Sequence, residues 1–358
     1  MANSIISEIQ RTIGMNDSAS IWMGLDVHKH SYHIALVSGE SRPVTWSAPA
    51  DPSSVVKTLH SNGIHLQGAC FEAGPTGFKL ARVLKSEDIP VIVAAPSKVP
   101  RSVSPGSKTD RLDCIKLAQF ASKGLIRPIA IPTEQCEAER DLLRRRHQLL
   151  DSIRKTKQRI KALFLFHGMK EPDEVVHWSS KSIQALLATP FLVDDKNVLK
   201  SHIRELSFFL REKKLVETQI HEICSRADHC DVYDALRTVP GVGFVTASTF
   251  CLELFDPERF DRAEEVTSYL GLAPTVRHSG LKTPRGHLVP VGQKRLRSLL
   301  IEAAWVWIKR DAKAHEQYRK LLGKTGVPQK AIAAMARRLA IIMWRLSVEK
   351  RAYRLSNY

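Results

Sequence analysis

The chain lacks any long apolar run, and this absence excludes a membrane-spanning segment. No stretch approaches the roughly 18–20 apolar residues needed to cross a bilayer. The first twenty residues are polar and mixed, without the apolar core of a signal peptide. We therefore expect a soluble, cytoplasmic protein that has no membrane partner.

Cysteine is scarce and scattered, with six in 358 residues and no Cys-x-x-Cys pair. Such usage is typical of a reducing compartment. The tightest group, Cys224 with His229 and Cys230, has no second pair at zinc spacing. We interpret these residues as ordinary thiols and a surface imidazole.

Acidic residues are also in short supply. The chain has 37 Asp and Glu against 54 Lys and Arg, a formal charge of +17 and a pI near 9.7. This imbalance favours a polyanionic partner, with nucleic acid first and a membrane surface second. Charge that serves only solubility is the alternative. Because 43% of the residues are hydrophobic, a disordered chain is excluded and two or three structural units are expected.

The first part of the chain, residues 1–132, predicts a mixed sheet flanked by helices. Asn62-Gly63 ends the first helix, and Pro75 is expected in the first turn of the second. The expected elements are three strands within 21–48, a helix over 51–63, a strand over 65–73, a helix over 74–88, a strand over 89–96 and a helix from 109.

Residues 133–230 predict a helical, coiled-coil region, and residues 231–358 a mainly helical C-terminal domain. Between residues 141 and 170 there are nine Lys and Arg against two Asp. A second helix is expected near 202–226, and the two helices could pair within the chain or between protomers. The apolar stripe that predicts the first helix consists of Leu143, Leu150, Ile153, Ile160 and Phe164.

Four carboxylates occupy informative positions in the first part of the chain. Asp26 and Glu72 end predicted strands, while Asp110 and Asp113 are three residues apart at the start of a predicted helix. Residues i and i+3 share a helix face. Each acid alone is typical of a turn or a cap, but together they predict a metal site. Oxygen ligands favour magnesium or manganese, and two such ions can clamp a phosphodiester.

At these residues the sequence resembles a known family. GLDVHK at Asp26, FEAGPTG at Glu72 and KTDRLDC at Asp110 and Asp113 look like motifs of the DEDD transposases of insertion-sequence family one-hundred-ten. The resemblance resumes in VPGVG and in YLGLAPTVRHSG further along. It implies a ribonuclease H/RuvC-like N-terminal domain and a C-terminal transposase domain. By this resemblance the four acids bind the metal and are catalytic.

Basic residues and one serine stand out in the C-terminal domain. Residue by residue, Ser279 beside Gly280 is typical of a turn; the resemblance implies that it is the nucleophile of recombination, bound covalently to DNA. The surrounding basic residues could neutralise several phosphates. The candidate nucleic-acid-binding residues are Arg277, Lys282, Arg285, Lys294, Arg295 and Arg297.

These features together predict a magnesium-dependent DNA transposase or recombinase that acts on donor and target DNA. The resemblance further implies a guide RNA encoded by the element and a site shared between protomers, hence a homo-oligomer, a dimer or a tetramer, assembled through the helical region. A metal-only nuclease of the Holliday-junction type, whose C-terminal domain only binds DNA, is the alternative enzyme. A structural nucleic-acid-binding protein with a degenerate acidic site is the non-enzymatic alternative.

Overall fold

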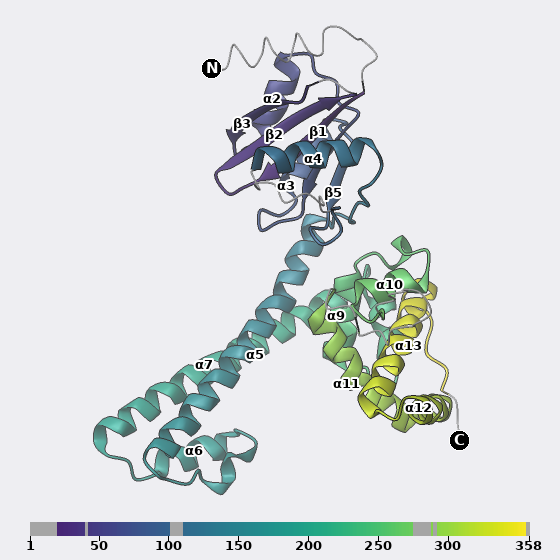
Figure 1. Cartoon of the computed structure of the whole chain (residues 1–358). Coiled ribbons are helices and arrows are strands. Elements are labelled where there is room, and N and C mark those ends of the chain that lie inside the picture. The colour runs from purple at the N-terminus through teal and green to yellow at the C-terminus, as the bar shows by residue number, and fades with distance from the viewer. Residues whose placement is uncertain (1–19, 40–41, 101–109, 275–287, 289–291, 356–358) are drawn as a thin grey trace. The chain divides into compact units, whose positions relative to one another are not determined.

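The structure is a computed structural model, and it divides the chain into two compact units, Met1–Ile131 and Pro132–Tyr358 (Figure 1). Each unit is described by itself. The side chains of Asp110, Arg111 and Val176 are also outside the description. The described backbone comprises all residues except 1–19, 40–41, 101–109, 275–287, 289–291 and 356–358.

Unit 1 contains a five-stranded mixed sheet with the order β3-β2-β1-β4-β5. The first three strands form an antiparallel meander, whereas β4 and β5 run parallel to β1. Parallel pairing needs helical crossovers, which the chain supplies. The strands are β1 (Ile21–Val27), β2 (Ser31–Ser38), β3 (Val44–Pro49), β4 (Gly68–Glu72) and β5 (Val91–Ala94).

Helices cover both faces of this sheet. On one face, α2 (Pro52–Ser61) and α3 (Lys79–Ser86) enclose a core that includes Leu25 and Phe71. On the other face, α4 (Asp110–Ser122) packs its Leu117 against Cys70 (Figure 1). The mixed sheet flanked by helices is therefore confirmed, and it is consistent with the RuvC-like fold that the resemblance implies.

The start of α3 differs from the sequence-based prediction. The helix begins at Lys79 and not near Pro75, which lies in a turn. Gly77 in that turn has a φ of +70°, a left-handed conformation that interrupts a right-handed helix. The Pro at the predicted first turn therefore belongs to the connection after β4.

Unit 2 begins with a long helical hairpin formed by α5 (Glu134–Phe166) and α7 (Val193–Cys224) (Figure 1). Thr133 caps α5, since its side chain accepts a hydrogen bond from the Cys136 amide. The hairpin also carries the 3-10 turn η1 (Asp173–Val176) and α6 (Ser180–Ala188). The two long helices thus pair within the chain, the first of the two arrangements that the sequence left open.

The apolar stripe predicted for α5 is buried at four of its five positions and differs at one. Leu149 is fully buried whereas Leu150 is only half-buried, and Thr156 fills a core position. The Thr156 hydroxyl donates to Glu205 Oε2 on α7 at 3.0 Å. A polar residue that is satisfied by the partner helix can occupy a core position, and an apolar pattern cannot reveal this.

The remainder of unit 2 is a bundle of helices whose core also includes Leu149 of α5 and Ile220 of α7. Gly241 has a φ of +85°, and a Cβ atom there would lie 2.5 Å from the Ala303 carbonyl oxygen. This glycine therefore serves a tight turn packed on a helix. The elements are α8 (Cys230–Arg237), α9 (Phe244–Leu254), η2 (Pro257–Arg259), α10 (Ala263–Tyr269), α11 (Lys294–Arg310), α12 (Ala312–Thr325) and α13 (Pro328–Glu349).

The mainly helical character predicted for the second half of the chain is confirmed. The finer division of this half at residue 230 stays a prediction. None of the described helices has the length and apolar character needed to cross a bilayer.

Candidate functional site

Two of the predicted site residues lie at the ends of adjacent parallel strands. Leu25 of β1 is in register with Phe71 of β4, so Asp26 and Glu72 are the next residues along the two strands. Neighbouring strands lie about 4.8 Å apart, and residues in parallel register face the same side of a sheet. The sheet therefore holds these two carboxylates side by side at one edge.

A glycine in β1 brings α4 onto the same face. A Cβ atom on Gly24 would lie 2.0 Å from the Cys114 carbonyl oxygen and 2.7 Å from the Ala118 amide nitrogen. Only a residue without a side chain allows this approach. Side chains of a strand alternate between faces, so Asp26 lies on the same face as Gly24, under α4.

The first turns of α4 carry Asp113 toward this edge. The pKa of the Cys114 thiol is raised to about 11, first by burial and then also by the negative charges of Asp26 and Asp113. On β4, burial and the charge of Glu72 raise the pKa of Cys70 to about 12. The Cys114 thiol therefore lies in the field of Asp26 and Asp113, and the Cys70 thiol in the field of Glu72.

The carboxylates at this edge remain accessible to solvent. The side chains of Asp26 and Asp113 are 27% and 29% exposed. Asp26 Oδ2 contacts His28 Nε2 at 3.1 Å, and Asp113 Oδ1 lies 3.8 Å from Lys116 Nζ. His28 also packs edge-on against His33, with 5.8 Å between ring centroids. The site is thus a half-open acidic edge that a charged ligand can reach.

The donor set at this edge fits a divalent cation. Carboxylate oxygens are the ligands that magnesium and manganese prefer, and here they come from two strands and a helix held in fixed register. Among the described residues, Asp26, Glu72 and Asp113 do not form a closed cluster with all ligand atoms within 4.8 Å. The Asp110 side chain lies outside the description, although its backbone begins α4. The described acids therefore form an open arrangement.

Several predicted residues of the C-terminal domain lie outside the described residues. The structure does describe where the stretch that contains them departs and returns, because an antiparallel bridge pairs Pro274 with Leu288. This bridge brings together the two residues that flank the stretch with the candidate nucleophile. The residues outside the description are Arg277, Ser279, Lys282 and Arg285.

Two family models match most of the chain. Residues 23–167 match the model of DEDD transposases of the IS110 type. Residues 233–319 match the transposase model of the IS116/IS110/IS902 family. A transposase for the insertion sequence element IS1533 of Leptospira borgpetersenii is 30% identical over 299 residues, which cover 80% of this chain and 84% of the relative. The chain belongs to the IS110 family of transposases.

Two further relatives match long stretches of the chain. A putative transposase of Sinorhizobium fredii, y4qE, is 29% identical over 366 residues, covering 94% of this chain and 90% of the relative. A pilin gene-inverting protein of Moraxella lacunata is 24% identical over 257 residues, covering 71% and 70%. This IS110-family protein is therefore an enzyme that acts on DNA, and its DEDD family model suggests dependence on a divalent metal.

Three of the basic residues predicted for this transposase open α11 of unit 2. Lys294 is exposed, whereas Arg295 and Arg297 are half-buried. Arg297 Nη1 donates to the Gly271 carbonyl oxygen at 3.2 Å, and Arg295 Nη1 to the Leu143 carbonyl oxygen at 3.5 Å. Two of the three side chains therefore also hold unit 2 together, which their sequence pattern did not reveal.

The interpretation of His229 as a surface imidazole is wrong. Its side chain is only 13% exposed, and its Nε2 lies 3.0 Å from Glu139 Oε2 and 3.7 Å from Asp228 Oδ2. Glu139 also accepts from Gln135 at 3.0 Å and contacts Arg226 at 3.5 Å. Because these donors already surround Glu139, the cluster ties the start of α5 to the connection between α7 and α8. Residues ninety positions apart form it, so sequence spacing gave no signal.

Proposed function

We propose that this transposase cleaves and exchanges DNA strands at a metal-dependent site formed by Asp26, Glu72, Asp110 and Asp113. The observation that carries the proposal is the adjacency of Asp26 and Glu72 under α4. The Gly24 contact supports it, since it holds the first turns of α4 against the strand that bears Asp26.

In this proposal the acids bind one or two divalent ions, magnesium or manganese. Such ions, when bound, stabilise charge on the phosphoryl oxygens during displacement at phosphorus. The chain's own contribution is geometric: β1 and β4 fix two carboxylates in register, and α4 carries Asp113 on the same face, with Asp110 as its first residue. His28, in contact with Asp26, orients that carboxylate by its hydrogen bond.

Ser279 would supply the nucleophile in this proposal. Its hydroxyl oxygen forms a bond to phosphorus as the bond to the leaving strand's oxygen breaks; a base takes the serine proton, and the leaving oxygen gains one. A serine–DNA link conserves the phosphodiester energy for rejoining. A cavity of about 650 Å³ at the Pro274–Leu288 bridge, lined in part by Lys324, Lys330 and Arg337, supports DNA binding beside this segment.

Two further features of the proposal come from family membership and charge. An element-encoded guide RNA would select donor and target DNA by base pairing, so the protein itself would need no base-reading motif. The α5–α7 hairpin, as a coiled-coil assembly element, would join protomers into a dimer or tetramer with a shared site. Both features are compatible with the +17 formal charge of the chain, which suits RNA as well as DNA.

The metal site is tested by four isosteric variants, Asp26→Asn, Glu72→Gln, Asp110→Asn and Asp113→Asn. Each should reduce strand cleavage by at least about a hundredfold with magnesium, because losing one ligand displaces the metal. Glu87→Gln is the matched control, since Glu87 is an acid of unit 1 that pairs with His60 away from the sheet edge. Near-normal cleavage in two of the four variants would exclude the proposed site.

The serine is tested on a nicked or suicide DNA substrate. We expect a covalent protein–DNA adduct that mass spectrometry locates on the peptide with Ser279. Ser279→Ala should lose the adduct and strand exchange but retain DNA binding, whereas Thr283→Ala, which removes another hydroxyl of the same stretch, should retain both. Robust cleavage by Ser279→Ala would identify the protein as the metal-only nuclease of the Holliday-junction type.

A further inference from the structure

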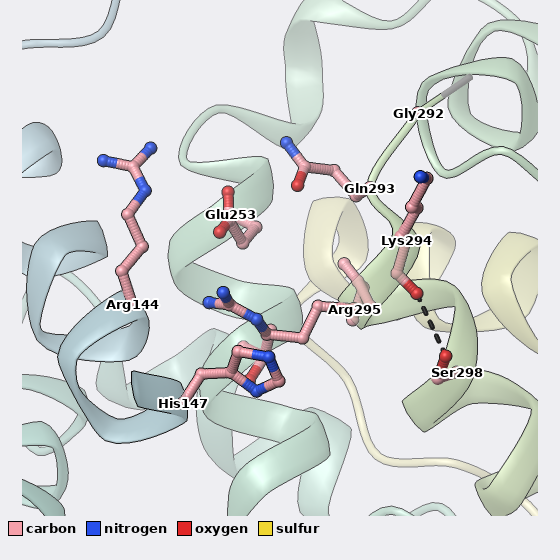
Figure 2. Close-up of a pocket in the computed structure, with 10 residues that line it drawn as sticks. Arg144, His147, Glu253, Gly292, Gln293, Lys294, Arg295 and Ser298 are labelled. Carbon is pink, nitrogen blue, oxygen red and sulfur yellow. Dashed lines mark hydrogen bonds between the residues drawn. The ribbon is translucent and has the colours of Figure 1, made fainter. Parts of the chain in front are cut away.

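Unit 2 contains a cavity of about 570 Å³ between α5, α9 and the start of α11. Figure 2 shows the guanidinium of Arg295 extending from α11 toward α5, where Arg144 and His147 lie. Glu253 of α9 lies on the opposite side of the Arg295 guanidinium in this view. Segments that lie some 150 residues apart in the chain therefore meet around one cavity.

The walls of this cavity carry mostly positive charge. Arg144 and His147 come from α5, and Lys294 and Arg295 from α11. The lining carboxylate, Glu253, is 8% exposed and contacts Arg140 at 3.5 Å, which offsets part of its charge. The acids that pair with Arg144 and His147, at 2.5 and 3.6 Å, are Asp141 and Asp151 on the exposed surface of α5. Such exposed pairs are weak, so the cavity remains cationic.

The first turn of α11 increases this positive potential. The N-terminal amides of a helix carry partial positive charge and favour acidic neighbours. Here the first turn contains no acid, begins with Lys294 and Arg295, and receives no hydrogen bond from the side chain of its cap residue, Gln293. This choice of residues opposes the helix dipole, so an anion at this end would relieve the repulsion.

Two polar groups of the lining have hydrogen-bonding capacity left for a ligand. Thr249 of α9 is 4% exposed, and its hydroxyl makes none of the hydrogen bonds found among the described residues. Burial lowers the pKa of the Arg295 guanidinium; the charge of Glu253 opposes this shift and the charge of Arg144 adds to it. A ligand in the cavity can therefore accept hydrogen bonds from the Thr249 hydroxyl and from the Arg295 donors that the Leu143 carbonyl does not use.

The backbone around the cavity is held in place before any ligand arrives. Gly292 has a φ of +100°, and a Cβ there would lie 2.6 Å from the Gly271 amide nitrogen. Arg297 donates to the Gly271 carbonyl, and the Gln293 amide donates to the Tyr269 carbonyl at 3.3 Å. The start of α11 is therefore fixed against the end of α10, and such preorganisation lowers the entropic cost of binding.

We propose that this cavity binds one phosphate group of a nucleic-acid backbone, held by Arg144, Lys294, Arg295 and the Thr249 hydroxyl. Guanidinium groups match the oxygen geometry of a phosphate, and the cavity volume of about 570 Å³ is ample for one such group. The inference rests on the nucleic-acid partner of the proposed function. It depends neither on the metal site nor on Ser279.

The test compares the salt dependence of binding for the full chain and its Arg144→Gln and Lys294→Gln variants. Both residues are exposed, so folding should be retained, as circular dichroism can verify. Each neutralised phosphate contributes about 0.9 to the slope of log K against log salt for duplex DNA and about 0.7 for single strands. Because both side chains contact the same phosphate, the double variant should lose about one contact in total, not two.

Arg154→Gln is the matched control, since Arg154 also lies on α5 and pairs with an aspartate three residues earlier, at 3.3 Å. When Arg154→Gln is combined with Lys294→Gln, the loss of slope should equal the sum of the losses in the two single variants. Two results would overturn the proposal and leave an ordinary basic surface. One is an unchanged slope in the double variant. The other is a loss of slope in the double variant that equals the sum of the losses in Arg144→Gln and Lys294→Gln.

Binding is measured in EDTA by fluorescence anisotropy with duplex DNA, single-stranded DNA and single-stranded RNA of equal length. The nucleic acid for which the double variant loses one contact is the source of the phosphate. Loss with all three probes means that any backbone phosphate is accepted. Because no cleavage occurs in EDTA, this result is independent of the four acids: inactive Asp26→Asn should bind with the wild-type slope even if the proposed cleavage chemistry fails.

Discussion

The acidic edge of unit 1 and the basic cavity of unit 2 are built by opposite means. At the acidic edge, Asp26 and Glu72 are fixed by the hydrogen-bond register of two neighbouring strands. At the basic cavity, Arg144 and Arg295 line one pocket only because helices from distant parts of the chain pack together. One site depends on a ladder of backbone bonds, and the other on the packing of side chains.

This difference determines how each site can be damaged. A sheet register changes only in whole steps, since a slip of one residue turns every side chain to the other face. Helix packing instead yields gradually as core contacts are lost. We therefore expect the acidic edge to lose its geometry abruptly when the close contact between Gly24 and the α4 backbone is disturbed. The basic cavity should lose its geometry in proportion to the stability of the α5 packing.

The largest effect is expected for Gly24→Val. A Cβ atom at this position would lie 2.0 Å from the Cys114 carbonyl oxygen and 2.7 Å from the Ala118 amide nitrogen. Both are backbone atoms, which cannot rotate away. Overpacking usually costs 1–3 kcal/mol, and contact with rigid backbone should raise this to more than about 4 kcal/mol. Urea denaturation followed in unit 1, for example by Trp22 or Trp46 fluorescence, measures the loss.

Gly74→Ala is the control for this change. A Cβ atom there would meet nothing closer than the Glu72 carbonyl oxygen at 4.0 Å, so its effect on stability should stay below about 1 kcal/mol. In both variants, the salt slope of nucleic-acid binding should be unchanged under conditions in which unit 2 is folded. A Gly24→Val protein with wild-type stability would mean that α4 does not rest on β1 as described.

The same contrast explains what the sequence could predict. The positions of Asp26 and Glu72 were predictable because local apolar runs indicate where strands end and in which order they follow one another. The cavity was not predictable, because no local pattern indicates that Arg144 and Arg295 line the same pocket. The start of α3 was missed because a Pro-containing turn resembles a helix start until the left-handed Gly77 is seen.

A second prediction concerns the packing that supports the basic cavity. Leu149→Ala should destabilise unit 2 by about 3 kcal/mol, because this fully buried leucine joins α5 to the bundle core and its loss leaves a cavity. Leu150→Ala should cost less than about 1.5 kcal/mol, since Leu150 is half-buried. Equilibrium denaturation of the two variants compares them directly. A larger loss for Leu150→Ala would restore the stripe predicted from the sequence.

A smaller effect separates the two roles of Arg297. The sequence predicts a phosphate contact, whereas the structure gives its guanidinium a hydrogen bond to the Gly271 carbonyl. Arg297→Ala should therefore lower the free energy of unfolding by about 1–2 kcal/mol and leave most of the salt slope intact. Arg310→Ala, at the exposed far end of α11, should change stability by less than about 0.5 kcal/mol. A slope loss near one unit without destabilisation would favour the sequence-based role.

The last prediction is a dependence of unit 2 stability on alkaline pH. Burial, and then the charge of Glu139, raise the pKa of the Cys224 thiol from 9.0 to about 12. The folded protein thus keeps this proton at pH values where the unfolded chain loses it. The stability contributed by the protonated thiol is complete below pH 9 and is lost as the pH rises toward 12.

Cys224→Ala removes this titration, so the comparison isolates it from other groups of unit 2. The stability advantage of the wild type over Cys224→Ala should shrink by up to about 1.4 kcal/mol per pH unit above pH 9. Denaturation at several pH values between 8 and 10.5 measures the difference. Leu236→Ala is the control, because this buried leucine of the same core does not titrate, so its difference from the wild type should stay constant. If the difference in stability between the wild type and Cys224→Ala is also constant with pH, water reaches this thiol. The bundle core around α7 would then be less tightly packed than the structure indicates.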